Sequence, residues 1–380
     1  MDRFEVVVVG AGAIGCSIAA ALAPDHDLLV VDRTGVAAEA TGRSAGLVSP
    51  TLFYGAYPGA ARHANDAFRD LDGTGAFSFT EWPRLDYVTP EDEAEARGAA
   101  ERRSEAGFPV SYLPREAVER RYPVANLDSF AGAVRYGDTG WVDPATYART
   151  LLDVAIANGA DVEFDTTVEA LSVSGDVVDG VETDGGSYGA DRVVLAAGYR
   201  TSALLPGARV PIRPYRTQCA TLASGTEIEG TLPIGRVASE GLYFRPEHGG
   251  ELLVGGRHDP VEVPEHASER ADESFLRTVA AEVPRLLRGF EGARVVGSWA
   301  GVDAGTPDGR PVIGRPTGAP GGALVATGFN GLGITLSPVA AALVRSLVAG
   351  EECPFETEPF RADRFETDRP EFSLRSTADL

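Results

Sequence analysis

Three glycines near the start of the chain have the types and spacing that bind the phosphates of a dinucleotide. Gly10, Gly12 and Gly15 form the pattern G-x-G-x-x-G. In this pattern the first glycine permits a tight turn, the second lets the backbone approach a pyrophosphate, and the third lets the next helix lie close to the preceding strand. Asp32 follows the next apolar run, where a carboxylate accepts hydrogen bonds from an adenosine ribose. The alternative is a tight strand-to-helix connection that binds nothing.

The elements expected around these glycines favour dinucleotide binding. Residues 6–9 are an apolar β-branched run, typical of a parallel strand buried on both faces. Residues 13–23 should form a helix whose free N–H groups and positive dipole end point at the pyrophosphate, and Pro24 should end it. Residues 28–31 are the next strand. Because all these parts occur in order within the first 33 residues, we predict a nucleotide-binding βαβ unit.

A second glycine-rich loop lies near the other end of the chain. Gly328, Gly331 and Gly333 follow a buried strand at 324–326 and precede an apolar helix. Since one nucleotide needs one phosphate cradle, this loop could hold the other end of a large cofactor, such as an isoalloxazine ring. The helix dipole there would favour negative charge at N1 and the C2 carbonyl of the reduced ring. A plain strand-to-helix turn is the alternative.

The segment 35–50, GVAAEATGRSAGLVSP, is rich in small residues and cannot pack like a core helix. Because it follows Asp32 directly, we expect it to lie along the cofactor. Thr41, Ser44 and nearby backbone N–H groups would then be available to phosphate or ribose oxygens.

Composition limits the class of protein. The 380 residues are enough for about two domains, and 43% hydrophobic with 24% charged residues is typical of a globular chain. The 56 acidic residues outnumber the 34 basic ones, all of them Arg, for a net charge of -22. This balance argues against nucleic acid or an anionic membrane as partner. We interpret it as a surface adapted to high salt; an acidic protein with GC-biased codon usage is the alternative.

The cysteines and histidines indicate no metal site and no disulfide framework. Cys16, Cys219 and Cys353 are few and scattered, and the five histidines have no metal-ligand spacing. We expect Cys16 to be a core residue, and a reduced cytoplasm as the compartment. The apolar N-terminal run breaks at Gly10, so neither a signal peptide nor a membrane span is expected.

The remaining pattern alternates helices and strands. A capping box at 89–92 should start one helix with Pro90 as its first residue, and Asp143 should N-cap another that ends at 158–159. Helices are expected at 62–72, 90–106, 114–121, 143–158, 268–287 and after 333, the last ended by Gly350. Strands are expected at 77–88, 160–165, 168–173, 177–183, 187–191 and 192–197, with two more after 295. Residues 210–256 alternate with period two, as in an antiparallel sheet.

Eight segments together carry a family resemblance. They are GAGAIG (10–15), VVDR (30–33), TGRSAG (41–46), GWVDPATYARTLLDVAIANGA (140–160), ADRVVLAAG (190–198), LYFRPEHGGELLVGG (242–256), WAGVDAGTPDGRPVIG (299–314) and ATGFNGLGITLSP (326–338). The chain resembles, over nearly its whole length, the D-amino-acid oxidase superfamily of FAD-dependent amine oxidoreductases. That group includes glycine oxidase, sarcosine oxidase and dehydrogenase, and dimethylglycine and proline dehydrogenases.

The resemblance implies an α/β fold with an α+β substrate domain. A discontinuous Rossmann-like FAD-binding domain is expected at 1–81, 137–209 and 294–367. An antiparallel-sheet substrate domain is expected at 82–136 and 210–293, and a C-terminal tail at 368–380. The family chemistry is hydride transfer from the carbon beside a neutral amine to flavin N5, giving an imine that water hydrolyses, often without a protein base.

The motifs and the resemblance together select the candidate site residues. Those expected to bind FAD are Gly10, Gly12, Ala13, Ile14, Gly15, Asp32, Arg33, Thr41, Ser44, Ala45, Gly46, Val168, Ala197, Gly198, Gly301, Asn330, Gly331, Leu332, Gly333, Ile334 and Thr335. Tyr243 stands where glycine oxidase has a tyrosine that reaches the substrate carboxylate; an aromatic packed in the core is the alternative. Arg245 should share its sheet face, unless it pairs with Glu247 or Glu251 at the surface.

Three departures from the family pattern affect the expected function. Family members that bind FAD covalently carry a Cys at the position of Gly301 or a His at the position of Ser44. This chain has neither, so FAD should be non-covalent here. Asp303 stands where glycine oxidase and D-amino-acid dehydrogenases carry a carboxylate-binding Arg. Either another arginine (Arg43, Arg213, Arg216 or Arg245) holds the substrate acid, or the substrate is not a simple D-amino acid. Asp303 itself either faces a cationic substrate group or pairs with Arg310 in solvent.

The third departure is the missing lysine. In sarcosine-oxidase-like members a lysine near flavin N5 is associated with fast reaction with oxygen. We therefore expect an amino acid or amine dehydrogenase, with a quinone, a flavoprotein or, less readily, oxygen as acceptor. The alternatives are a 2-hydroxy acid or glycerol phosphate dehydrogenase, and a non-catalytic FAD-binding assembly factor.

Overall fold

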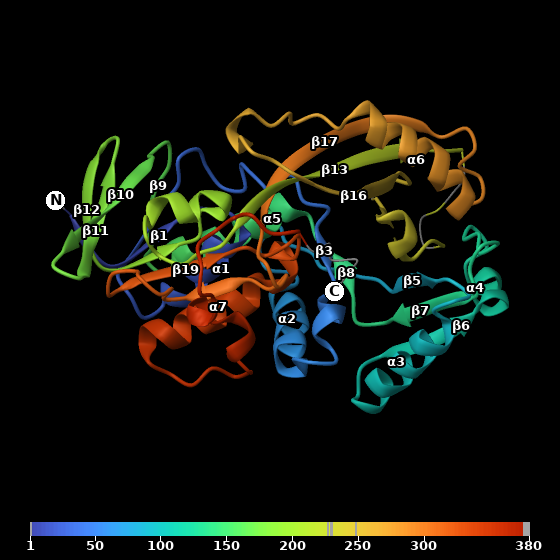
Figure 1. The fold of residues 1–380 in the computed structure, drawn as a ribbon, viewed down its shortest axis with the longest axis horizontal. Helices are drawn as coiled ribbons and strands as arrows, with labels where there is room; N and C mark the ends of the chain where they lie inside the picture. Colours follow the sequence, from blue (N-terminus) through green and yellow to red (C-terminus); the bar gives the residue numbers. More distant parts are fainter. Residues whose placement is uncertain (1, 226–227, 229–230, 248, 375–380) are drawn as a thin grey trace.

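The computed structural model describes residues 2–225, 228, 231–247 and 249–374. Its first large sheet contains the predicted nucleotide-binding strands, at the left of Figure 1. β1 (Arg3–Val9) lies between β2 (Leu28–Val31) and β12 (Gly186–Leu195), and both pairings are parallel. β9 (Asp161–Glu163) and β19 (Ala323–Thr327) extend the parallel part, next to β2 and β12 respectively. Val6, Val7 and Val8 are fully buried, as predicted for a strand covered on both faces.

Antiparallel strands complete this sheet. β10 (Val168–Ser174) and β11 (Val177–Thr183) pair with each other, and β11 forms the predicted hairpin with β12. β18 (Val312–Gly314) pairs antiparallel with β19. The two strands predicted at 187–191 and 192–197 therefore belong mostly to one continuous strand, β12.

Helices cover the parallel sheet and bring both glycine loops to it. α1 (Ala13–Leu22) packs against α5 (Pro144–Ala157) and α7 (Gly333–Ala349), and α2 (Pro58–Leu71) packs against α7. The Tyr147 hydroxyl lies 2.8 Å from Ser337 Oγ, which joins α5 to α7. Asp143 N-caps α5 as predicted, accepting from the Thr146 amide at 2.7 Å. Gly350, with φ +72°, ends α7 as predicted.

The second large sheet has the strand order β17-β13-β16-β15-β14-β5-β7-β6. Its strands are β5 (Arg84–Val88), β6 (Val110–Pro114), β7 (Gly132–Tyr136), β13 (Arg213–Ala223), β14 (Ile234–Val237), β15 (Leu242–Pro246), β16 (Leu252–Pro260) and β17 (Arg294–Gly305). All neighbours are antiparallel except β14 and β5. The antiparallel sheet predicted from the alternation at 210–256 is confirmed.

This sheet has its own core and helices. α3 (Glu93–Glu105) and α4 (Arg115–Arg121) lie beside β5, β6 and β7, at the right of Figure 1. α6 (Glu273–Leu286) buries Phe275, Val279 and Val283 in a second apolar cluster that also contains Phe244. The short 3₁₀ segments are Pro50–Phe53, Gly198–Leu204, Ala238–Glu240, Pro264–His266, Glu358–Phe360 and Ala362–Arg364.

Several predicted boundaries were wrong for local reasons. α3 begins at Glu93 rather than Pro90, because the Thr89 hydroxyl donates to the Asp92 carboxylate (2.8 Å) and 89–92 forms a turn. The strand predicted at 77–88 is broken before β5 by Pro83, which has no N–H to donate. Its first part, β4 (Thr80–Glu81), joins a small sheet with β8 (Gly140–Trp141) and β3 (Leu47–Val48). α6 begins at Glu273, because the amide of its N-cap, Asp272, donates instead to Gln218 Oε1 (2.7 Å).

The chain passes from the second large sheet to the first after β17. Residues 294–305, grouped with the FAD-binding segments from sequence, form β17, which pairs with β13 from Arg213–Gly305 to Ala223–Arg294. The chain then enters the first sheet at β18, so 295–350 holds three strands rather than two. The predicted α/β class with an antiparallel second sheet is confirmed. Among the residues that the structure describes, no helix has the length and apolar composition to cross a membrane.

Candidate functional site

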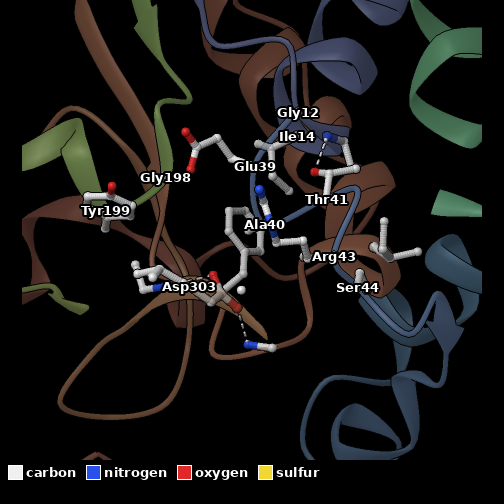
Figure 2. Close-up of a pocket in the computed structure, with 18 of the residues that line it drawn as sticks. Gly12, Ile14, Glu39, Ala40, Thr41, Arg43, Ser44, Gly198, Tyr199 and Asp303 are labelled. Atoms are coloured by element: carbon white, nitrogen blue, oxygen red, sulfur yellow. Dashed lines mark hydrogen bonds between the residues drawn. The ribbon is translucent and has the colours of Figure 1, made fainter. Parts of the chain in front are cut away.

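A cavity of about 530 Å³ collects most of the predicted site residues, and its volume is typical of sites for small ligands and cofactors. It is lined by both glycine loops, the segment around Thr41 and one face of the antiparallel sheet. Figure 2 shows Gly12, Thr41 and Ser44 on one side of it and Asp303 on another. Of the residues expected to bind FAD, all line the cavity except Gly15, Gly46 and Asn330.

The first glycine loop leaves backbone open to the cavity. Gly10 has φ +112°, and a Cβ there would lie 2.5 Å from the Ala196 carbonyl oxygen. A Cβ at Gly15 would lie 1.8 Å from the Gly10 carbonyl oxygen, so Gly15 acts through helix-to-strand packing. Gly12 lines the cavity at the N-cap of α1. These three roles match those the motif requires for a bound pyrophosphate, so the loop fits a dinucleotide.

Two side chains hold this loop in shape. The Ala13 amide donates to Thr41 Oγ1 (2.9 Å), the contact dashed at the top of Figure 2. Asp32 accepts from the Ala11 amide (2.7 Å) with one carboxylate oxygen and from the Thr34 and Gly35 amides (2.9 and 3.0 Å) with the other. Asp32 lines the cavity directly after β2, which is the position expected for a ribose-binding carboxylate.

Charged residues cluster near this end of the cavity. Glu39 bonds to Arg33 and lies 3.7 Å from the Arg200 guanidinium. Burial raises the pKa of the Glu39 carboxyl, but Arg33, Arg200 and Arg43 together outweigh burial and the net pKa is lowered. Val168, Ala197 and Gly198 also line the wall here.

The second glycine loop also contributes to the cavity wall. Gly331, Leu332, Gly333 and Ile334 line it at the start of α7. Thr335 lines it too, and its hydroxyl donates to the Leu47 carbonyl (3.0 Å) and accepts from the Ser49 amide (3.1 Å). That hydroxyl therefore ties the loop to β3.

Two predicted residues shape loops from outside the wall. Asn330, at φ +51°, accepts from the Thr306 amide (2.9 Å). Gly46, at φ +70°, accepts from the Val142 amide (2.9 Å), and a Cβ there would lie 2.0 Å from the Val142 carbonyl oxygen. Both are positioning residues for the segments that do line the cavity.

Asp303 is fixed in the cavity wall by three hydrogen bonds. One carboxylate oxygen accepts from the Ala304 amide (2.7 Å), and the other from the Gly331 amide (2.8 Å, dashed in Figure 2) and the Tyr215 hydroxyl (3.1 Å). Burial raises the pKa of the carboxyl, and the hydrogen bonds only partly offset this. The alternative of a solvent pair with Arg310 is wrong, because Arg310 pairs with Asp308 (2.9 Å).

Tyr243 also lines the cavity, from β15. Its ring lies over Gly255, where a Cβ would come within 2.3 Å of the ring, and its hydroxyl lies 3.7 Å from Cys219 Sγ. Burial raises the pKa of the Tyr243 hydroxyl well above its ordinary value. The hydroxyl therefore stays protonated and can donate at neutral pH.

The structure does not bring Arg245 to the cavity. It is buried, donates to the Ala45 carbonyl (2.7 Å) and pairs with Glu247 (2.6 Å). The alternative prediction, a surface pair of Arg245 with Glu247 or Glu251, named the right partner in Glu247, but the arginine lies inside the protein rather than at the surface. Its guanidinium holds the segment around Ala45 against the sheet, which is a positioning role.

The other arginines proposed to hold a substrate acid are mostly engaged elsewhere. Arg213 donates to the Phe372 carbonyl (2.5 Å) and Arg216 pairs with Asp272 (2.7 Å), both away from the cavity wall. Arg43 does line the cavity and pairs with Glu269 (2.5 Å).

The wall residues that sequence reasoning missed include two arginines of the second large sheet, Arg84 and Arg236. They lie on β5 and β14, which are far apart in sequence and pair in parallel. The alternation Arg84, Asp86 within one strand put both side chains on one face, but no local pattern indicates which strand lies alongside.

Comparisons with known proteins identify the family and the fold. The family model for FAD-dependent oxidoreductases (the D-amino-acid oxidase family) matches residues 5–347. The chain is 30% identical to the glycine oxidase of Pseudomonas aeruginosa, over 94% of this chain and 98% of that protein. Its fold is shared with glycine oxidase from Geobacillus kaustophilus (TM-score 0.83, 24% identity, 96% and 100% of the two chains). It is also shared with L-proline dehydrogenase from P. horikoshii (TM-score 0.85, 21% identity, 92% and 95%).

Proposed function

Because the chain belongs to the D-amino-acid oxidase family of FAD-dependent oxidoreductases, we propose that it is a dehydrogenase for the C–N bond of an amino acid or secondary amine. The supporting observation is one cavity that joins both glycine loops to Asp303, Tyr215 and Tyr243 on the antiparallel sheet. The resemblance to glycine oxidase supports an amino acid substrate. We also propose the cytoplasm as its compartment. The chain would divide into a discontinuous FAD-binding domain and a substrate domain built on the antiparallel sheet.

The chemistry divides between cofactor and protein. FAD, when bound, supplies a hydride acceptor, so the protein has to bind, orient and shield the amine. We assign Gly12, Thr41 and Asp32 to the adenosine and pyrophosphate end, and Gly331 to Thr335 to the flavin end. Asp303 would attract the amino group, because its carboxylate is fixed at the cavity wall by the three hydrogen bonds.

A second candidate function is oxidation of a 2-hydroxy acid, which needs a base for the alcohol proton. His258 lines the cavity beside Tyr215, with ring centroids 5.0 Å apart, and is the side chain that favours this alternative. A dye-coupled screen of primary and secondary amino acids against the matching 2-hydroxy acids separates the two. We expect dye reduction with amines, accompanied by an oxo product and released ammonia or alkylamine. Turnover with hydroxy acids alone would favour the second function, and none with either would favour an assembly factor.

The flavin is expected to be non-covalent. Gly301 and Ser44 line the cavity at the family's attachment positions, and neither can form the covalent link. Acid or heat should therefore release all of the flavin as free FAD, measured as absorbance in the supernatant. Yellow colour remaining with the precipitated chain would contradict this.

Removing the Asp303 charge should weaken catalysis. We expect Asp303→Ala to lower kcat/KM for an amine by about tenfold or more. Asp303→Asn, which keeps a similar shape, should show a comparable loss if the charge is what matters. As the pH is lowered, protonation of Asp303 should reduce kcat/KM of the parent. Because the pKa of Asp303 is raised, this fall should begin at a higher pH than it would for an exposed aspartate, and the Asn variant should not show it. Unchanged steady-state kinetics in both variants would leave Asp303 a loop anchor only.

Salt should stabilise the fold if the acidic surface is an adaptation to high salt. At a net charge of -22, raising KCl from ~0.1 M to ~2 M shortens the screening length from about 10 Å to about 2 Å and weakens self-repulsion. We expect Tm to rise by about 5 °C or more, read by calorimetry. A flat or falling Tm would favour codon bias as the origin of the composition.

A further inference from the structure

We propose that the cavity contains an acid-binding subsite, formed by Arg84 and Arg236 around Asp86, which selects substrates bearing an acid group several bonds from the oxidised C–N bond. This inference rests on the proposed amine oxidation. Such substrates are amino dicarboxylic acids or amines with a terminal carboxylate.

Strand register brings the three side chains together. Arg236 of β14 lies opposite Asp86 of β5 and opposite Tyr243 of β15, and Arg84 is two residues from Asp86. Residues directly opposite in a sheet, and residues two apart in a strand, point to the same face. Arg84, Arg236 and Tyr243 line the cavity on that face, and Asp86 lies between the two arginines.

Both guanidinium groups are held in place. Arg84 makes a two-point contact with Asp86 (2.5 and 2.8 Å) and donates to Ser49 Oγ (2.6 Å). Arg236 donates to the same carboxylate (3.2 Å). The side chains of Arg84 and Arg236 are 10% and 19% exposed. The two preorganised arginines carry one more positive charge than the single carboxylate they share with each other, so they can attract a ligand carboxylate, and burial in the wall strengthens that attraction.

This subsite is far from Asp303 in the cavity wall. Asp303 and its partner Tyr215 lie on β17 and β13, whereas Arg236 lies on β14. In the order β17-β13-β16-β15-β14, β13 and β14 are three strand spacings apart, or about 14 Å. The Tyr243 hydroxyl also points toward β13, since it approaches Cys219 of that strand.

The separation sets the length of the substrate. In an α-amino acid the amino and carboxylate groups share one carbon, so they cannot engage Asp303 and Arg236 together. A substrate with its amine toward Asp303 and an acid at the end of a longer chain can approach both. The wall is therefore acidic at one end and basic at the other, matching a dipolar, elongated ligand.

Binding of non-oxidisable acids tests the subsite without turnover. Glutarate and its monoamide, glutaramate, differ in one charge and are titrated against the holoenzyme while the flavin absorbance is followed. We expect glutarate to bind about tenfold or more tightly. Arg236→Gln should abolish that difference and Arg236→Lys should retain part of it. Arg277→Gln, which removes an exposed arginine of α6, is the matched control and should keep the full difference.

Substrate pairs then test the same subsite in the reaction. Glutamate and glutamine, both enantiomers of each, are compared for anaerobic flavin reduction. We expect glutamate to reduce the flavin at least about tenfold faster at low concentration, with the advantage lost in Arg236→Gln. Equal binding of glutarate and glutaramate, or a preference that survives Arg236→Gln, would overturn the subsite. Glutarate binding that depends on Arg236 while no amine reduces the flavin would support the subsite and refute the proposed amine oxidation.

Discussion

Replacing Gly12 with valine is expected to abolish FAD binding while leaving the protein folded. Gly12 lines the cavity, and a Cβ there would already lie 3.0 Å from Thr41 Oγ1, which accepts from the Ala13 amide. The two further methyl groups of valine would occupy the space where backbone must approach a pyrophosphate. The variant should elute colourless from a desalting column, whereas the parent elutes yellow.

Two matched variants separate binding from folding. Gly12→Ala adds only the Cβ and should weaken binding less than valine. Gly15→Val should destabilise the fold itself, because its Cβ would overlap the Gly10 carbonyl oxygen. Circular dichroism and Tm of the Gly12→Val protein should match the colourless parent after FAD removal. Retention of stoichiometric FAD by Gly12→Val would contradict the assignment of this loop to the pyrophosphate.

Oxygen is expected to be a poor electron acceptor, slower than an artificial dye by about a hundredfold or more. Fast reaction with oxygen benefits from a fixed positive charge that stabilises developing superoxide, and the chain contains no lysine. The difference is measured by reducing the holoenzyme with substrate and then mixing it with either air-saturated buffer or dye.

The arginines in the cavity wall are poor substitutes for a lysine in stabilising superoxide. Among the residues that the structure describes, those lining the cavity are Arg33, Arg43, Arg84, Arg200 and Arg236. Each lies within ion-pair distance of Glu39, Glu269 or Asp86. Their charges are therefore partly neutralised, and the guanidinium is broader and more weakly hydrated than an ammonium. Hydrogen peroxide formed at the rate of dye reduction would contradict this expectation and identify an oxidase.

Local sequence signals predicted the structure around the first glycine loop and the start of α5 well. The first glycine loop, Asp32 and the N-cap Asp143 each depend on residues close in sequence, and each lies where its pattern indicated. Errors occurred where a contact from elsewhere competed, as when Gln218 took the amide of Asp272 before α6. The pairing of β17 with β13 was missed because register between distant strands is set by the whole sheet.

The residues on the substrate side of the cavity were harder to predict, because they too depend on contacts between segments distant in sequence. Arg245 shares a strand with Tyr243 but is turned to the Ala45 carbonyl and Glu247, contacts made by segments distant in sequence or by the following turn. Arg84 and Arg236 enter the wall because β5 and β14, about 150 residues apart, pair in parallel. The role of an arginine in a cavity thus depends on tertiary partners that a single sequence does not identify.

Anaerobic mixing of the holoenzyme with amino acids and secondary amines in high salt tests the proposed function most directly. We predict loss of the flavin absorbance with at least one amine, and one equivalent of oxo product and of released ammonia or alkylamine per flavin. A flavin that stays oxidised with every amine, while a 2-hydroxy acid bleaches it, would contradict the account.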